Sequence, residues 1–488
     1  MSYLELLKLA APETIVVVTA LLVLTVGLTT TRVTMLGPIV AVLGLAAAIG
    51  AITMLPAHAN LFGGMLVISP LNSLFKIICL ALAIVTIPLM AAEKSLPNPG
   101  EYVAMLLLGT VGLMLLVGSE ELLMIFIGLE LLGLSLYVLA AFDKTDVRSA
   151  EAGLKYFLFG STASAFTLFG LSLVYGMSGT TALAAIGQKL TTLPLQPLLA
   201  VGIVMTLIGF AFKIAAAPFH LWAPDAYQGA PIPSAAFIAS GSKVASFVVL
   251  GKIVLLGFGP VHGSADWHAM IAGWSPVLAA LAALSILLGN FVALAQTNVR
   301  RLLAYSAVAH GGYTLLGVVA GGREGFSATL FYTSVYAVTL IGAFAVVGAV
   351  RRETGGDDFQ NFAGLASRSP LAAACMSVFM LSLAGLPPLA GFFGKFYLFS
   401  VAFRAGGNHG LLWLVAIALF GSFVSLYYYL IVLKVIFVDK SSESEPGQPS
   451  LATRHVFGEA VISVLAAAVL FLGIMPQTLA ARIIASLP

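Results

Sequence analysis

Long runs of apolar residues, separated by short breaks that are charged or rich in glycine and proline, dominate this sequence. About 20 such residues cross the hydrocarbon core of a bilayer as an α-helix, so the pattern predicts about fourteen spans. The expected spans are 13–30, 33–55, 71–92, 102–118, 120–141, 150–176, 198–222, 233–257, 271–295, 299–320, 325–350, 369–401, 411–437 and 457–475. The sequence therefore predicts an all-α, polytopic membrane protein.

Basic residues fall unevenly on the two sides of these spans. One set of loops carries Arg32, Lys94, Lys144, Arg148, Arg300, Arg301, Arg351, Arg352, Arg368, Lys440 and Arg454, and the other carries Lys8, Lys189, Arg323, Arg404 and Arg482. The richer face is expected to be cytoplasmic, which places both termini outside. The first span lacks a basic leader and a small-residue cleavage site, so we expect it to be retained.

The stretch 212–233, FKIAAAPFHLWAPDAYQGAPIP, places a lysine and a helix-breaking proline inside one span. Pro218 has no backbone N–H, so the carbonyl of Ile214 should lose its helical partner. Lys213 at bilayer depth should face a polar interior, because exposure of its charge to lipid is costly. These features predict an ion path, although a kinked helix whose lysine reaches the membrane surface would carry the same residues.

A second interrupted span, 384–396, has the sequence AGLPPLAGFFGKF. Pro387 and Pro388 break the helical pattern and Lys395 follows about two turns later. Two broken helices, each fourth in a group of five spans, predict two inverted repeats, an architecture typical of transporters. The expected units are an N-terminal three-helix segment at 1–101, a first repeat at 102–258, an inverted second repeat at 271–437, and a last span with a short tail at 438–488.

Four ionisable residues lie far from any predicted span end: Glu130, Lys213, Lys243 and Lys395. An isolated carboxylate in the membrane needs a cationic partner or a proton, and we expect Lys213 to be the partner of Glu130. Burial disfavours a charged amine and a nearby carboxylate favours it, so this set could load and release protons as distances change. The alternative is that static ion pairs hold the helices together.

Other polar residues allow two interpretations. His220 and His310 could carry protons, because the unperturbed pKa of histidine is close to physiological pH, and a structural role is equally compatible with His310. Lys155, near the start of its span, is also a candidate for the proton path. Ser240, Ser242 and Ser246 could line a hydrated channel or bond backbone carbonyls. Lys76, Lys252 and Lys434 lie near span ends, where we expect their amines to reach the membrane surface.

Composition agrees with a membrane protein and excludes other classes. Of 488 residues, 60% are hydrophobic and 9% are charged, and the mean hydropathy is +1.06. The net charge of +3 is spread over loops, so no nucleic-acid surface is predicted. Cys79 and Cys375, each in an apolar run, are too few for an iron–sulfur cluster and are expected to be buried thiols. Asp266, His262 and His268 form a loop cluster that we expect to be solvated, so no metal site is predicted.

The motifs LELLGLSLYVL, FKIAAAPFHLWAPDAYQGAP, SKVASFVV and NVRRLLAYSAVAHGGY resemble subunit N of bacterial respiratory complex I over almost the whole chain. The resemblance implies fourteen helices with two inverted five-helix units and a polar axis on which the functional positions are Glu130, Lys213, Lys243 and Lys395. Related subunits L and M and Mrp-type cation/proton antiporters share the glutamate and the first broken-helix lysine. The form PFHLWAPDAYQGAPIP, the lysine at 395 and the short tail favour subunit N.

This resemblance implies a subunit without redox chemistry of its own in a proton-translocating NADH:quinone oxidoreductase of the bacterial inner membrane. No catalytic or cofactor-binding residue is expected in this chain, and FMN, iron–sulfur clusters and a quinone are expected in other subunits. Expected partners are neighbouring antiporter-like and small membrane-arm subunits, and membrane lipids. A subunit of a cation/proton antiporter is the alternative, and a structural scaffold would leave the four mid-membrane charges unexplained.

Overall fold

A computed structural model describes residues 3–29, 36–93, 96, 98–405, 409–440 and 456–487. Arg32, Lys94 and Arg454, which entered the predicted charge asymmetry, lie outside the described residues. Within the described ranges the chain is almost entirely helical, as predicted, and one small antiparallel hairpin pairs β1 with β2 in the register Ala59 with Ile68.

The N-terminal segment comprises α1 (Tyr3–Leu9), α2 (Ala11–Thr29), α3 (Leu36–Thr53), β1 (Ala59–Leu61), η1 (Phe62–Gly64), β2 (Leu66–Ile68), α4 (Pro70–Thr86) and η2 (Ile87–Ala92). The next elements are α5 (Pro99–Gly118), α6 (Leu122–Ala140), α7 (Val147–Ser178), α8 (Leu183–Leu190), α9 (Pro197–Lys213), α10 (Trp222–Gly229), α11 (Ile232–Ala239), α12 (Gly241–Lys252), η3 (Ile253–Gly257) and η4 (Gly259–Val261). The remainder comprises α13 (Trp274–Leu294), α14 (Val299–Ala320), α15 (Gly322–Thr354), α16 (Phe359–Phe362), α17 (Leu365–Arg368), α18 (Pro370–Ala384), α19 (Ala390–Arg404), α20 (Leu412–Phe437), α21 (Val456–Ile474) and α22 (Gln477–Ser486).

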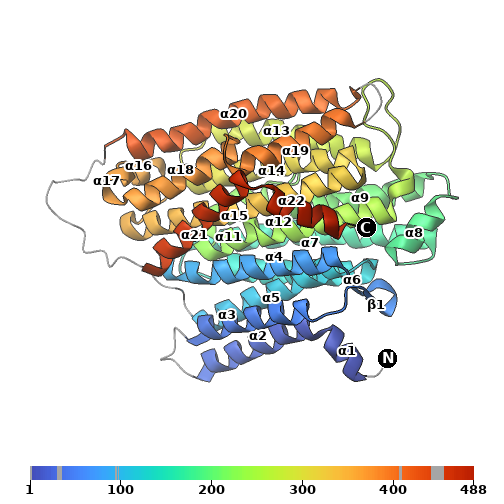
Figure 1. Ribbon diagram of the computed structural model, residues 1–488, viewed down its shortest axis with the longest axis horizontal. Helices are drawn as coiled ribbons and strands as arrows, with labels where there is room; N and C mark the ends of the chain where they lie inside the picture. Colours follow the sequence, from blue (N-terminus) through green and yellow to red (C-terminus); the bar gives the residue numbers. More distant parts are fainter. Residues whose placement is uncertain are drawn as a thin grey trace.

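The long helices lie side by side along one direction (Figure 1). In this view α2 and α3 form one edge and α20 the other, while α1, α8 and β1 lie at one end and α16 and α17 at the opposite end. Among the described residues, 11 helices are long and apolar enough to cross a membrane, or 12 if the bent pair at 458–486 counts as one span. The shorter apolar helices α9 and α18 end at the two predicted breaks.

The centre of the bundle is formed by α12, α14 and α15. In the most apolar window of each span, 94% of residues are buried for 232–257 and for α14, against 33% for α2 and 28% for α3. A helix that is buried on every side must satisfy its polar groups inside the protein. The central helices are therefore the place where buried charges can be held.

Two pairs of helices are built with the same local devices. The side chains of Glu121 and Asn298 cap the N-termini of α6 and α14, and their backbones form isolated bridges with Ala182 and Asp358, respectively. The long helices α7 and α15 each end at a glycine with positive φ, a conformation that glycine adopts without the steric cost of a side chain. The same helix–helix design thus occurs twice in the chain.

Both helix breaks contain the wide turn that a missing proline donor favours. The N–H of Ala216 donates to Ala211 O at 2.8 Å, and the N–H of Leu386 donates to Leu381 O at 3.1 Å. Each bond spans five residues in place of four and lies two residues before Pro218 or Pro388. Because proline cannot continue the helical ladder, the chain leaves the helix at these points.

Candidate functional site: a buried polar axis

The first break places Lys213 against α6. Lys213 is the last residue of α9 and is buried. A methyl group on Gly133 of α6 would lie 3.3 Å from Lys213 Nζ and 3.2 Å from the hydroxyl oxygen of Tyr137. Gly133 has no side chain, which leaves space for the amine of Lys213. Gly133 lies one helical turn from Glu130 on α6.

Glu130 and Lys213 interact without a direct ion pair among the described residues. The carboxylate of Glu130 accepts a hydrogen bond from Ser164 Oγ on α7, a partner that sequence spacing does not reveal. Lys213 is the cation whose charge acts on Glu130 from α9, so its role as the partner of Glu130 stays a prediction of electrostatic coupling.

The freed carbonyls of the first break are covered by other helices. Ile214 O, predicted to lose its helical donor, lies 3.3 Å from the position that a methyl group on Gly311 of α14 would take. Trp222 Nε1 donates to Phe212 O at 3.1 Å, and the N–H of Ala217 donates to Ser285 Oγ at 2.8 Å. The broken backbone is thus enclosed by protein, as irregular backbone at membrane depth requires.

Lys243, in the first turn of α12, points toward α14. Its Nζ donates to the carbonyl of Ala307 at 2.6 Å and lies 5.5 Å from the ring centroid of Tyr336. Of the three nearby serines, Ser240 and Ser246 donate to carbonyls of their own helix, at 2.6 and 2.7 Å. The simpler interpretation of these two hydroxyls, backbone bonding, is confirmed.

His310 lies between Lys243 and Lys395. Its ring nitrogens contact the hydroxyls of Tyr332 and Tyr429, the latter at 2.9 Å from Nε2, and the charges of both lysines act on it. Its ring centroid lies 4.9 Å from that of Tyr336 and 5.6 Å from that of Tyr313. Aromatic rings and hydroxyls therefore fill the space between the two lysines.

At the second break, the amine of Lys395 donates to a backbone carbonyl, that of Ala384, which has lost its helical donor because of the proline. Pro388 stands where a regular helix would supply the N–H donor to Ala384 O. Lys395 Nζ, from α19, donates to Ala384 O at 3.0 Å and to Ser422 Oγ at 3.0 Å, and lies 5.2 Å from the ring centroid of Tyr313. The lysine that follows the prolines in sequence therefore places its amine at the break in space.

One stretch of α14, residues 307–313, contacts the first break, Lys243 and the surroundings of Lys395. Ala307 accepts from Lys243, His310 joins the tyrosines, Gly311 faces the first break, and Tyr313 lies beside Lys395. We call the set Glu130, Lys213, Lys243, His310 and Lys395 the polar axis. Lys243, His310 and Lys395 meet along this central helix, whereas Lys213 ends α9 at the first break and Glu130 lies on α6.

The other two candidates for the proton path lie apart from this axis. His220 is buried in the first break, and its Nδ1 has no hydrogen-bond partner among the described residues. Lys155 is 38% exposed and forms ion pairs with Glu151 and Asp225, and Asp225 also binds Arg301 at 2.7 Å. Lys155 therefore belongs to a partly exposed ionic cluster.

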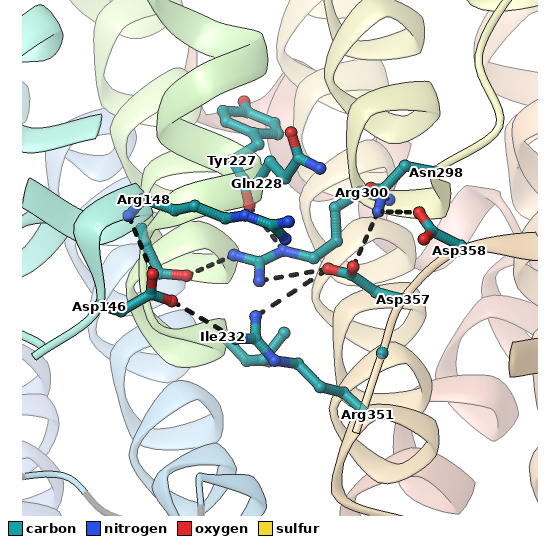
Figure 2. A network of polar contacts seen from close by, with 12 residues as sticks. Asp146, Arg148, Tyr227, Gln228, Ile232, Asn298, Arg300, Arg351, Asp357 and Asp358 are labelled. Atoms are coloured by element: carbon teal, nitrogen blue, oxygen red, sulfur yellow. Dashed lines mark hydrogen bonds and ion pairs between the residues drawn. The ribbon is translucent and has the colours of Figure 1, made fainter. Parts of the chain in front are cut away.

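Sequence analysis missed a buried ionic network at one end of the bundle (Figure 2). The guanidinium of Arg300 is fully buried, donates to Tyr227 O at 2.8 Å and to Ala230 O, and lies 3.4 Å from Asp357. Asp357 also accepts from Asn298, and Arg351 bridges Asp357 and Asp146. The signal was present as two arginines opening an apolar span and two aspartates after the next, but we counted Arg300 and Arg351 only as loop charges.

Two of three lysines near span ends do not reach the membrane surface. Lys76 is 3% exposed and pairs with Glu13 at 2.6 Å, and Lys252 is 2% exposed. That prediction is wrong for both residues, because α2, α4 and α5 cover these ends. Lys434 is 63% exposed and pairs with Asp439, as expected of a lysine at a helix end.

No group of histidine, cysteine, aspartate and glutamate suited to a metal ion occurs among the described residues. Cys79 and Cys375 are free and buried, which confirms the expectation of buried thiols. The chemistry that the axis offers is therefore that of amines, a carboxylate, an imidazole and hydroxyls, the groups from which proton paths in membranes are built.

This fold is that of a known family of multi-pass membrane subunits. Residues 119–425 match the family described as NADH:quinone oxidoreductase/Mrp antiporter, TM. Within that family, the chain is 44% identical to NADH-quinone oxidoreductase subunit N 2 of Acidobacterium capsulatum, over 98% of both chains. It is 41% identical to subunit N of Desulforamulus reducens, over 86% of this chain and 85% of the relative. The chain belongs to the NADH-quinone oxidoreductase subunit N family.

Solved structures agree with this assignment. A chain of respiratory complex I from Thermus thermophilus with bound aureothin is 31% identical, with a TM-score of 0.77 over 96% of this chain and 98% of that one. A chain of the Mrp complex from Dietzia sp. has a TM-score of 0.82 at 21% identity over 98% and 97% of the two chains, which shows a shared fold alone. The resemblance inferred from the motifs is confirmed.

Proposed function

We propose that this chain is a proton-translocating subunit in the membrane arm of an NADH:quinone oxidoreductase. The observation that carries the proposal is the set of buried polar and aromatic groups along α14, from the first helix break, which Lys213 adjoins, to Lys395 at the second. Four mid-membrane charges are costly and typically mark ion pathways. Membership of the subunit N family supports the coupling to NADH oxidation and quinone reduction in other subunits.

In the proposed mechanism, Glu130 tunes the proton affinity of Lys213 from one turn away on α6. Protons pass through Lys243 and the His310 cluster, and Lys395 exchanges them with the other half of the path. His220, buried at the first break, and Lys155, at the partly exposed cluster, supply protons to Lys213. Small changes in the distance between Glu130 and Lys213 would load or release a proton, since a nearby carboxylate favours the charged amine.

The proposal includes fourteen membrane spans with two inverted repeats, 102–258 and 271–437, between an N-terminal segment at 1–101 and a C-terminal part at 438–488. Counting α9 with α10 and α18 with α19 as broken spans, and α21 with its bent continuation as one, gives this number. The shared caps, bridges and wide turns of the two units support the repeat. Both termini are proposed to lie on the periplasmic side of the bacterial inner membrane.

The proposed partners are other subunits of the same complex, especially antiporter-like and small membrane-arm subunits, together with lipids. FMN, iron–sulfur clusters and a quinone are proposed to be held by those subunits, and this chain is proposed to act without redox chemistry or stand-alone catalysis.

Purification of the tagged chain from gently extracted native membranes tests the assignment. We expect it to copurify with a large complex that oxidises NADH with a quinone acceptor and is inhibited by rotenone or piericidin. Recovery of a stable preparation with a few small membrane proteins and no such activity would contradict the proposal.

A subunit of a cation/proton antiporter is the second candidate, and the family model and the shared fold with the Mrp complex favour it. It predicts sodium- or potassium-dependent proton flux in the absence of NADH. Ion-flux assays on the purified preparation distinguish the two functions.

Gly133→Val is expected to reduce NADH-driven proton uptake about tenfold in an assembled complex, because the new side chain displaces the amine of Lys213 and misplaced groups transfer protons poorly. Proton uptake into liposomes, normalised to assembled complex, measures the effect. The matched control is Gly176→Val on α7, where an added methyl would meet no atom within 4 Å. Equal uptake in the two variants would show that the space at Gly133 is unimportant.

A further inference from the structure

Lys252 and Glu120 form a buried polar site outside the polar axis. Lys252, the last residue of α12, is 2% exposed, and its Nζ donates to Asn72 Oδ1 at 2.5 Å and to Val117 O at 2.7 Å. It also lies 3.5 Å from Ser119 O, and the carboxylate of Glu120 is 3.6 Å away at the entry to α6. Like Lys243 and Lys395, this buried lysine donates to a backbone carbonyl, and it has in addition a carboxylate beside it.

The helix around Lys252 is irregular. Immediately after this lysine, η3 makes a π-type turn in which the N–H of Phe258 donates to Ile253 O at 2.8 Å. The same wide turn occurs beside Lys213 and beside the carbonyl that binds Lys395. Single π-turns inside helices occur frequently at functional sites. Lys252 therefore shares a second feature with two lysines of the axis.

Lys252 and Glu120 both line a cavity of about 940 Å³. The cavity lies between the β1–β2 hairpin, η3, the start of α15 and the end of α22, and His58, Ser69 and Arg323 also line it. The side chain of Glu120 is 29% exposed, whereas that of Lys252 is enclosed. The carboxylate thus stands between the buried amine and the solvent that enters the cavity.

We propose that Lys252 and Glu120 form a further proton-exchange site, through which protons pass between the interior of this chain and water in the cavity. This inference rests on the proposed function. In the exchange step an N–H bond of the Lys252 ammonium breaks and an O–H bond forms on Glu120, which leaves a neutral amine and a carboxylic acid. Glu120 then gives the proton to cavity water, and a proton from the interior restores the ammonium.

The alternative role of the pair is to hold α12, α4 and α6 together, and two variants separate the roles. Lys252→Arg keeps a positive charge and its donors, but arginine does not give up its proton in proteins. Lys252→Met with Glu120→Gln removes both charges together, so neither partner is left uncompensated. If the pair is purely structural, the variants change assembly, but each assembled complex keeps its proton uptake. If the pair exchanges protons, uptake per assembled complex falls.

The experiment reconstitutes the whole purified complex in liposomes and measures NADH-driven proton uptake per assembled complex, with assembly read from native gels. Both Lys252 variants are expected to lose about tenfold, because the positioned proton-transfer groups are gone while cavity water still exchanges protons slowly. The control is Lys434→Met with Asp439→Asn, which neutralises an ion pair at the end of α20 that does not line the cavity. We expect the control to keep wild-type uptake.

Wild-type uptake by either assembled Lys252 variant would overturn the inference. Failure of both to assemble, alongside a normal Lys434/Asp439 control, would identify a structural pair and also overturn it. A Lys213→Ala complex measured in the same assay separates the two proposals. Normal uptake with that variant contradicts the proposed function, whereas impaired Lys213→Ala with normal Lys252 variants contradicts only this inference.

Discussion

Lys213→Ala is expected to lower NADH-driven proton uptake about a hundredfold, the lower end of the range for loss of a positioned proton-transfer group. The amine lies at the first helix break, beside Gly133, which is one turn from Glu130 on α6. Without it, the carboxylate of Glu130 keeps only the hydroxyl of Ser164 and has no amine to tune.

Proton uptake into liposomes and native-gel assembly measure this effect together. Lys434→Ala is the control, because that lysine is 63% exposed at the end of α20 and pairs only with Asp439 among the described residues. A normal ratio of protons to electrons in an assembled Lys213→Ala complex would contradict the role of the polar axis.

Arg300→Met is expected to prevent stable accumulation of the chain. The substitution leaves Asp357 buried beside fewer cations and removes the donors to Tyr227 O and Ala230 O, which close the end of α10. Removing one partner of a buried ion pair costs about 3–5 kcal/mol, a large part of the stability of a folded protein. The amount of chain in membranes and the midpoint of thermal unfolding of the purified complex measure the loss.

Two further variants test the reason for that loss. Adding Asp357→Asn to Arg300→Met is expected to restore part of the stability, because the uncompensated carboxylate is removed and the two sites are coupled. Arg404→Met is the surface control, since this arginine is 66% exposed and lies 3.9 Å from Glu324. An Arg300→Met chain as stable as the Arg404→Met chain would show that the network in Figure 2 does not hold α10 against α14.

The sequence predicted the broken helices well because their cause is local. Proline removes one N–H wherever it stands in a helix, so the interruption at Pro218 and the freed carbonyl of Ile214 follow from the chain alone. Which group donates a hydrogen bond to such a carbonyl, or covers it, depends on other helices. The carbonyl of Ala384 is bound by Lys395, which lies 11 residues further along the chain on the helix after the break.

The predictions that were wrong concerned contacts between segments far apart in the chain, not local causes. The position of Lys76 and Lys252 near span ends led to the prediction that their amines would reach the membrane surface. The position of a residue along a span does not show which other elements cover the end of the helix. Packing of α2, α4 and α5 buries both amines and supplies Glu13, Asn72 and Glu120 as partners. The ionic network around Arg300 was not predicted for the same reason, since its members come from segments far apart in the chain.

The sequence by itself determined that this chain is a helical membrane protein and that two helices break at prolines, and it predicted that a glutamate, three lysines and a histidine lie at bilayer depth. These properties depend on local composition, on the missing proline donor and on the cost of a charge in lipid. Only the tertiary structure decided that Ser164 donates a hydrogen bond to Glu130, that Lys243, His310 and Lys395 lie along α14, and that Lys252 lines a cavity. Such contacts join residues tens to hundreds of positions apart, and their geometry is fixed by the packing of whole helices.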